Sequence, residues 1–310
     1  INMLKYVIIG AGGTGGIIGA YMTKAGKDVT IIARGNHLSA MRKGGLTIEK
    51  LWDNGKENIK VNVCDTENYD GKADVVFVCV KSYSVDEIIP FIKKISHKDT
   101  VVIPILNVYG TGAVMQKKLP DLLVTDGCIY VSANIKTPGV ILQHGKICKV
   151  LFGTRDHSNG NRLLATIAED LQDSGIEGVL SDNIQKDALQ KFSYVSPMGA
   201  AGMYFDAKAG DFQHEGPERE MFKGLVGEVE KLAEAMGIVY EEDLAEVNFK
   251  ILQGLAPEAT TSMQRDIYQG KASEADGLIF QVVRMGKEYG DKTPDYEKAA
   301  EKIAAILNQQ

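Results

Sequence analysis

Hydrophobic residues in the first half of the chain occur in short runs, rich in β-branched residues, that alternate with stretches of helical spacing. The run over residues 75–80 is uninterrupted, which is typical of a parallel strand covered on both faces. Strands that alternate with helices predict βαβ units and an open parallel sheet with helices on both sides. The further runs that predict strands are residues 6–9, 29–33, 101–105 and 122–124.

The second half carries apolar stripes that repeat with the period of a helix. One stripe begins after Pro217 and stops at Gly237, a second covers residues 278–283, and a third follows Thr293. We therefore place a domain boundary near residue 180. The prediction is an α/β protein whose residues 1–180 form a parallel-sheet domain and whose residues 181–310 form an all-helical domain.

The composition is that of an ordinary globular protein, with 44% hydrophobic residues, 25% charged residues and a net charge of −6. The negative charge offers no general attraction for nucleic acid. The four cysteines are widely spaced without a CxxC pair, so we expect no zinc or other metal site and a reduced, cytoplasmic location. Residues 6–23 are uncharged, but their six glycines favour a strand, a turn and a helix over a membrane segment.

A glycine-rich sequence follows the first predicted strand and opens the first predicted helix. It fits the pattern GxGxxG. The first glycine of this pattern permits a tight turn, the second lets the backbone approach a pyrophosphate, and the third allows close packing of helix on strand. The amides and dipole of the helix N-terminus then face the phosphates. The pattern predicts a dinucleotide site of the Rossmann type, against the alternative of a purely structural turn, and its residues are Gly10, Ala11, Gly12, Gly13, Thr14 and Gly15.

Arg34 follows the second predicted strand, where NAD sites usually have Asp or Glu to accept a hydrogen bond from the ribose 2′-hydroxyl. A guanidinium cannot accept that bond, but it pairs with a 2′-phosphate through two hydrogen bonds. Unless Arg34 is an ordinary solvated surface charge, it favours NADP(H) over NAD(H). Lys81 lies after the predicted strand at residues 75–80, at the end where ligands bind in open α/β sheets, and is expected to assist Arg34.

Several segments resemble the ketopantoate reductase (2-dehydropantoate 2-reductase) family. In the first half these are the glycine motif, Ala33-Arg34-Gly35 with His37-Leu38, residues 45–48, residues 80–83, and Asn107 with Gly110. In the second half Leu189-Gln190-Lys191-Phe192 resembles the segment of the catalytic lysine, and Ser262-Met263-Gln264-Arg265-Asp266 with Glu274 resembles the serine and glutamate pair. The resemblance covers nearly the whole chain.

The resemblance implies roles for the matching residues. Lys191 would donate a proton to the substrate carbonyl oxygen, on which negative charge develops during hydride transfer. Glu274 would accept a hydrogen bond from a substrate hydroxyl, and Ser262 would bind the substrate carboxylate. Asn107 would lie beside the nicotinamide and the lysine. Without the resemblance, these four residues read as a surface lysine, an exposed glutamate, a helix cap and a turn residue.

Three places depart from the family pattern. Val195 stands where the family commonly has an asparagine four residues after the catalytic lysine, which makes a more apolar substrate conceivable. We expect the adjacent Ser196 to contact the substrate. Leu189 replaces a common tryptophan, and Val108 and Tyr109 separate the asparagine from the glycine that usually follows it. These last two changes leave the fold prediction as it is.

The resemblance thus implies NADPH-dependent reduction of 2-dehydropantoate (ketopantoate) to pantoate, in pantothenate and coenzyme A synthesis. One alternative is a related two-domain dehydrogenase of another small 2-oxo or 3-hydroxy acid. Another is a sensor that binds NADP(H) without turnover, although a sensor needs no proton donor such as Lys191. We expect the reaction in a cleft between the domains, and a monomer or homodimer without a nucleic-acid or membrane partner.

Overall fold

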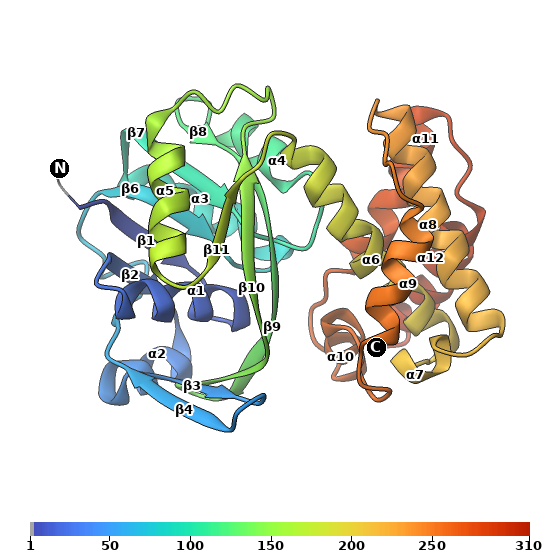
Figure 1. The fold of residues 1–310 in the computed structure, drawn as a ribbon, viewed down its shortest axis with the longest axis horizontal. Coiled ribbons are helices and arrows are strands. Elements are labelled where there is room, and N and C mark those ends of the chain that lie inside the picture. The colour runs from blue at the N-terminus through green and yellow to red at the C-terminus, as the bar shows by residue number, and fades with distance from the viewer. Residues whose placement is uncertain (1–2) are drawn as a thin grey trace. The chain divides into compact units, whose positions relative to one another are not determined.

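The computed structural model describes residues 3–310, which divide into two compact units (Figure 1). Unit 1 contains the residues up to Leu106 together with Gly110–Asp187. Unit 2 contains Asn107–Tyr109 and Ala188–Gln310. The three residues Asn107–Tyr109 therefore pack with the helices of unit 2, although the chain on either side of them belongs to unit 1.

Unit 1 is built on a six-stranded parallel sheet with the order β5-β2-β1-β6-β7-β8. The five strands predicted from the sequence are all present, and the prediction of a parallel-sheet domain is confirmed. The strands are β1 (Lys5–Ile9), β2 (Asp28–Ile32), β5 (Asn62–Cys64), β6 (Ala73–Val78), β7 (Ser96–Pro104) and β8 (Leu123–Val124).

Alternate residues of β1 enter different hydrophobic cores because successive side chains of a strand point to opposite faces. Tyr6 and Ile8 pack on the face covered by α1 (Gly13–Lys24), whereas Val7 and Ile9 pack on the face covered by α3 (Val85–Ile95) and α4 (Thr111–Lys118). This explains why the strands read as unbroken apolar runs.

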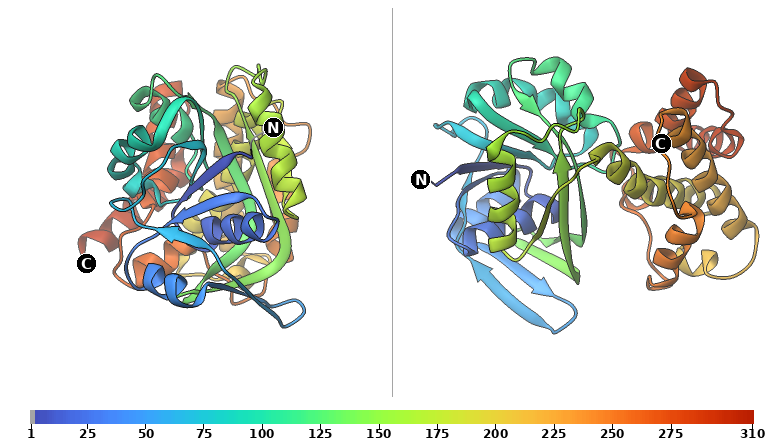
Figure 2. Two further views of the ribbon diagram at one scale, coloured as in Figure 1. Left: turned by 90° about the vertical axis from the view of Figure 1, so that its left-hand side faces the viewer. Right: turned by 45° about the horizontal axis from the view of Figure 1, so that its top comes forward.

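A second sheet of mixed direction, which the sequence did not reveal, completes unit 1. Its strands are β3 (Leu46–Lys50), β4 (Gly55–Ile59), β9 (Asp126–Thr137), β10 (Val140–Gly153) and β11 (Glu177–Leu180). The long antiparallel pair of β9 and β10 is the green ribbon in Figures 1 and 2, and α1 packs against both strands. The remaining helices of the unit are α2 (Gly35–Gly44), α5 (Arg162–Asp173) and a 3₁₀ turn, η1 (Ser82–Ser84).

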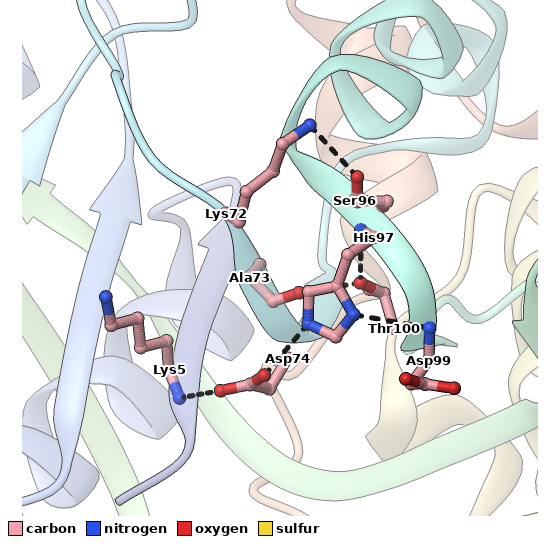
Figure 3. Close-up of polar contacts among 8 residues, drawn as sticks. All are labelled: Lys5, Lys72, Ala73, Asp74, Ser96, His97, Asp99 and Thr100. Atoms are coloured by element: carbon pink, nitrogen blue, oxygen red, sulfur yellow. Dashed lines mark hydrogen bonds and ion pairs between the residues drawn. The ribbon is translucent and has the colours of Figure 1, made fainter. Parts of the chain in front are cut away.

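A polar cluster joins β1, β6 and β7 at their amino ends (Figure 3). Asp74 accepts a hydrogen bond from the Lys5 backbone amide and another from Nε2 of His97, at 2.8 and 2.9 Å. Nδ1 of His97 accepts from the backbone amide of Asp99, and the Thr100 hydroxyl donates to the carbonyl of Ala73. These bonds lie at the opposite end of the strands from the glycine motif.

Unit 2 is helical, as predicted, and its residues 188–310 are drawn from yellow-green to red in Figure 2. Its helices are α6 (Ile184–Phe205, in this unit from Ala188), α7 (Ala209–Phe212), α8 (Pro217–Ala235), α9 (Leu244–Gln253), α10 (Ser262–Tyr268), α11 (Gln281–Tyr289) and α12 (Pro294–Asn308), with a π-helical turn, η2 (Asp276–Phe280). Within residues 3–310, none of the helices combines the length and apolar character that a membrane crossing requires.

Candidate active site

The glycine motif forms a tight turn at the carboxyl end of β1, between β2 and β6. The strand order reverses at this point, which is where ligands bind in open α/β sheets. Gly10 has a φ of +102°, and a Cβ there would lie 2.8 Å from the Cys79 carbonyl oxygen. A Cβ on Gly15 would lie 1.9 Å from the Gly10 carbonyl oxygen. The first and third glycines of the motif are therefore required by the close packing of the turn itself.

Gly12 differs from these two glycines because no atom other than those of its own residue and its two chain neighbours lies within 4 Å of the place its Cβ would occupy. It is the N-cap of α1, so it borders the amides of the first helical turn. Open space beside helix N-terminal amides is what a pyrophosphate requires.

Cys79 packs against Gly10 and Gly15 of the motif. Burial raises the pKa of its thiol to about 12, which keeps this side chain uncharged at neutral pH.

Arg34 and Lys81 follow the two strands that flank β1. Arg34 is the exposed N-cap residue of α2, two residues after β2 ends. Lys81 is the N-cap residue of η1 and comes three residues after β6 ends. Since β2, β1 and β6 are parallel neighbours, both cations lie at the same edge of the sheet as the glycine motif. This edge presents backbone amides and two cationic side chains.

Lys191 lies on α6 in unit 2, and its Nζ donates a hydrogen bond to Oδ1 of Asn107 at 3.0 Å. The segment that carries Asn107 is fixed in unit 2 by its next two residues. Tyr109 accepts a hydrogen bond at its carbonyl from Nε2 of Gln281 and packs its ring at a tilt against Phe192, with centroids 6.2 Å apart. The structure thus brings together two predicted site residues that are 84 positions apart in sequence.

Val195 and Gly199 follow Lys191 at intervals of four residues, so all three lie on one face of α6. Val195 is half-buried, and a Cβ on Gly199 would meet Met263 at 3.0 Å. This face of α6 therefore leads from the lysine towards the segment that contains Ser262. Between Lys191 and that segment, this face of α6 carries the aliphatic side chain of Val195 and the glycine Gly199.

Ser262 is the first residue of α10, and Thr261 rather than Ser262 caps that helix. The Thr261 hydroxyl accepts from the Gln264 amide at 3.2 Å, while Oε1 of Gln264 accepts from the Thr261 amide at 3.0 Å. The cap that the sequence suggested for Ser262 is thus formed by its neighbour.

Glu274 is buried, with 4% of its surface exposed, although its sequence neighbours suggested an exposed helical position. It comes just before the π-helical turn η2, in which Gly277 packs so closely on Val108 that a Cβ would lie 2.6 Å from a Val108 methyl group. Val108 follows Asn107 directly. The packing of Gly277 therefore brings the segment that carries Glu274 to the segment that carries Asn107.

Ser196 is fully buried, and its hydroxyl is used within the protein. It donates to the Leu278 carbonyl in η2 and accepts from the Tyr296 hydroxyl, 2.6 Å away. This geometry argues against the predicted substrate contact of Ser196, because the residue has no exposed surface and its single proton is already donated. Its hydroxyl instead holds the π-helical turn that follows Glu274.

Tyr296 and Glu228 support this arrangement, and neither was found from the sequence. Burial raises the pKa of the Tyr296 phenol far above its usual value, so the group remains a hydrogen-bond donor. Glu228 accepts from the backbone amides of Asp295 and Tyr296 and so fixes the start of α12, which carries the tyrosine. Burial raises the pKa of the Glu228 carboxyl, although these two amides oppose the shift. The sequence showed only that a helix begins after Thr293.

Comparison with known proteins finds family models that match both parts of the chain. The family model described as Ketopantoate reductase PanE/ApbA matches residues 6–157, and that of its C-terminal part matches residues 183–306. A 2-dehydropantoate 2-reductase of Pyrococcus horikoshii is 28% identical over 292 residues, which is 92% of this chain and 91% of that protein.

Two solved structures share the fold over 99% of both chains. One is a D-mandelate dehydrogenase solved with NADH and anilino(oxo)acetate, with a TM-score of 0.87 and 21% identity. The other is a ketopantoate reductase from Staphylococcus aureus, described as dimeric, with a TM-score of 0.84 and 22% identity. With both family models matched in order along the chain, this protein belongs to the ketopantoate reductase family, whose members are NAD(P)-dependent oxidoreductases.

Proposed function

We propose that this protein reduces a small 2-oxo acid with NADPH, and that ketopantoate is its substrate and pantoate its product. The observation that carries the proposal is the hydrogen bond from Lys191 to Asn107, which holds an ammonium group in the same unit as the buried Glu274. In this proposal residues 1–180 bind the cofactor and residues 181–310 bind the substrate. The reaction would serve pantothenate and coenzyme A synthesis in the cytoplasm.

The residues at the carboxyl end of β1 fit NADP(H). The open space at Gly12 and the amides that begin α1 would receive the pyrophosphate. Arg34 would pair with the 2′-phosphate through its two-pronged guanidinium, and Lys81 would add a second positive charge. When bound, this cofactor supplies the hydride for the reduction.

The side chains of unit 2 would supply the proton and orient the substrate. Lys191 would donate its proton to the carbonyl oxygen as negative charge develops there, and Asn107 would fix the direction of the ammonium group. Glu274 would accept a hydrogen bond from the substrate hydroxyl. Ser262 would donate one to the substrate carboxylate. A carboxylate, a carbonyl and a hydroxyl on one small branched skeleton describe ketopantoate.

A second candidate is the reduction of a more apolar 2-oxo acid. Val195 places an aliphatic side chain on the face of α6 that carries Lys191, where the family commonly has an asparagine. A D-mandelate dehydrogenase, named for an aryl hydroxy acid, has a similar fold, which supports this second candidate. In both candidates the same residues of unit 2 would bind the carbonyl and the carboxylate of the substrate. The two candidates therefore differ in whether the enzyme requires a hydroxyl on its substrate.

The test is a comparison of kcat/KM with NADPH for ketopantoate, 2-oxoisovalerate and phenylglyoxylate. 2-Oxoisovalerate is the analogue of ketopantoate that lacks its hydroxymethyl group, and with it the hydroxyl. A site with a polar group placed for a hydroxyl rejects the analogue that lacks it by roughly 10⁴–10⁵-fold. We expect discrimination of that order for ketopantoate. Comparable values for the first two acids would exclude ketopantoate as the dedicated substrate, and a preference for phenylglyoxylate would favour the second candidate.

Oligomeric state is part of the same proposal. We expect a monomer or a homodimer, and the dimeric Staphylococcus aureus reductase of the same fold supports the second of these. Sedimentation of the protein with and without NADPH distinguishes the two.

A further inference from the structure

His37 lies in the first turn of α2, three residues after Arg34, and its ring bonds to two backbone groups outside that helix. Nδ1 accepts a hydrogen bond from the Gly139 amide at 2.9 Å. Since an amide nitrogen only donates, Nδ1 carries no proton, and the proton of the neutral ring is on Nε2. Nε2 lies 2.8 Å from the carbonyl oxygen of Ala11 and donates to it.

The two bonds of His37 connect three segments of unit 1. Ala11 belongs to the glycine motif, His37 to α2, and Gly139 to the turn between β9 and β10. The turn is itself anchored, because the Gly139 carbonyl accepts from the Thr47 amide of β3 at 2.9 Å. The imidazole therefore fixes the glycine motif and the start of α2 against the second sheet.

The antiparallel pair of β9 and β10 contacts the glycine motif at a second point. Gly13 packs against β9 so closely that a Cβ would lie 2.2 Å from the Ala133 carbonyl oxygen. The motif is thus held by β9 at Gly13 and, through His37, by the β9–β10 turn. The second sheet acts as a support for the turn at the end of β1.

We propose that His37 is a positioning residue for the cofactor. It holds the Gly10–Gly15 turn, which would receive the pyrophosphate, at a fixed separation from Arg34, which would receive the 2′-phosphate. Both ring nitrogens are used by backbone groups, so the imidazole acts through these segments rather than by touching the cofactor. Fixing two half-sites before binding lowers the ordering cost that binding must overcome. This inference rests on the proposed function.

The experiment compares three variants of His37 by titration with NADPH and with 2′,5′-ADP, followed by fluorescence and calorimetry. His37→Ala removes both bonds. His37→Gln keeps a donor near the place of Nε2, and His37→Asn keeps an acceptor near the place of Nδ1. We expect His37→Ala to weaken NADPH binding about tenfold, the size of one good hydrogen bond. We expect His37→Gln to recover most of that loss and His37→Asn to recover little.

The comparison of ligands separates positioning from a general loss of structure. 2′,5′-ADP lacks the full pyrophosphate bridge to the nicotinamide half, so it depends less on the spacing of the two half-sites. Its affinity should change less than about threefold in His37→Ala. KM for NADPH should rise with kcat nearly unchanged, because His37 touches no reacting atom.

His97→Gln is the matched control. Nδ1 of His97 also accepts a hydrogen bond from a backbone amide, but His97 lies at the amino ends of the strands, away from the glycine motif (Figure 3). It should bind NADPH as the parent does. Parent-like NADPH affinity in His37→Ala would overturn the inference, and so would equal weakening of NADPH and 2′,5′-ADP. If His37→Ala does not fold, the NADPH affinities of His37→Gln and His37→Asn are compared instead. Equal affinities of these two variants would then overturn the inference. A parent protein that binds neither NADPH nor NADH would overturn the proposed function itself, and the inference with it.

Discussion

The candidate cofactor site of unit 1 is made mainly of backbone, whereas the candidate substrate site of unit 2 is made of side chains. At the end of β1, glycines bring amides and carbonyls into close contact, and Gly12 leaves open space. In unit 2, the Lys191 ammonium donates a hydrogen bond to the side-chain oxygen of Asn107. The turn after Glu274 is fixed by a hydrogen bond from the Ser196 hydroxyl. The two sites therefore depend on their sequences in different ways.

The difference follows from what each site would bind. A pyrophosphate has the same shape in every dinucleotide, and a row of amides at a helix N-terminus suits it without any particular side chain. A small acid is distinguished by the positions of its carbonyl, carboxylate and hydroxyl groups, which require separate side chains held in place. Changes in unit 2 should therefore alter turnover and selectivity, and changes in unit 1 should alter cofactor affinity.

The largest expected effect comes from Lys191→Ala. We expect kcat to fall by roughly 10²–10⁴, the range for loss of a general acid, with NADPH affinity nearly unchanged. Steady-state kinetics and an NADPH titration measure the two quantities. Lys191→Arg keeps the charge but holds its proton too tightly for transfer, and it should recover little of the rate. An undiminished kcat in Lys191→Ala would refute the assignment of the proton donor.

Arg34→Ala should have the next largest effect. The parent should bind NADPH more tightly than NADH, and the variant should lose about 10–100-fold in NADPH affinity because a charge-assisted contact with the 2′-phosphate is removed. NADH affinity should hardly change, since NADH has no 2′-phosphate. Parallel titrations with both cofactors give the ratio. Equal affinities for NADPH and NADH in the parent would contradict the assignment of Arg34.

Gly12→Ala and Gly13→Ala test whether the backbone forms the cofactor site. A methyl group at Gly12 enters open space, so the variant should fold as the parent does but lose about tenfold in NADPH affinity. A methyl group at Gly13 meets the Ala133 carbonyl oxygen at 2.2 Å and should lower the free energy of unfolding by about 1–3 kcal/mol. Thermal unfolding and NADPH titration separate the two outcomes. Unchanged affinity in Gly12→Ala would show that the open space is not where the cofactor binds.

The contrast between the sites also explains what could be predicted from the sequence. The parallel sheet and the glycine motif were evident because strand, turn and helix are consecutive and their residue types are dictated locally. The pairing of β9 with β10 was not evident, because β9 ends in exposed positions with no simple alternation. The burial of Glu274 was also missed, since it depends on Gly277 packing against Val108, far away in sequence.

Ser196 shows the limit of the family resemblance. Its place beside Val195 suggested a substrate contact, but only the structure shows that Leu278 and Tyr296 use its hydroxyl. Nothing in the spacing of these residues indicates that the three groups meet. Lys191 and Asn107, in contrast, were both identified as candidates through the resemblance, and they are hydrogen-bonded in the structure.

The smallest expected effect concerns Ser196 and sharpens the view of unit 2. Ser196→Ala leaves the Tyr296 hydroxyl and the Leu278 carbonyl buried without this partner, so the free energy of unfolding should fall by about 1–3 kcal/mol. Removing the tyrosine hydroxyl as well, in Ser196→Ala with Tyr296→Phe, leaves one fewer unpaired group and should recover part of that loss. Denaturant unfolding measures both.

Because η2 follows Glu274, Ser196→Ala should also raise KM for the substrate a few-fold, with the KM for NADPH and the affinity for NADPH unchanged. If Ser196 instead touched the substrate, the double variant would recover stability but the rise in KM would exceed about tenfold. A small, stability-linked change in KM therefore identifies Ser196 as a residue that positions Glu274.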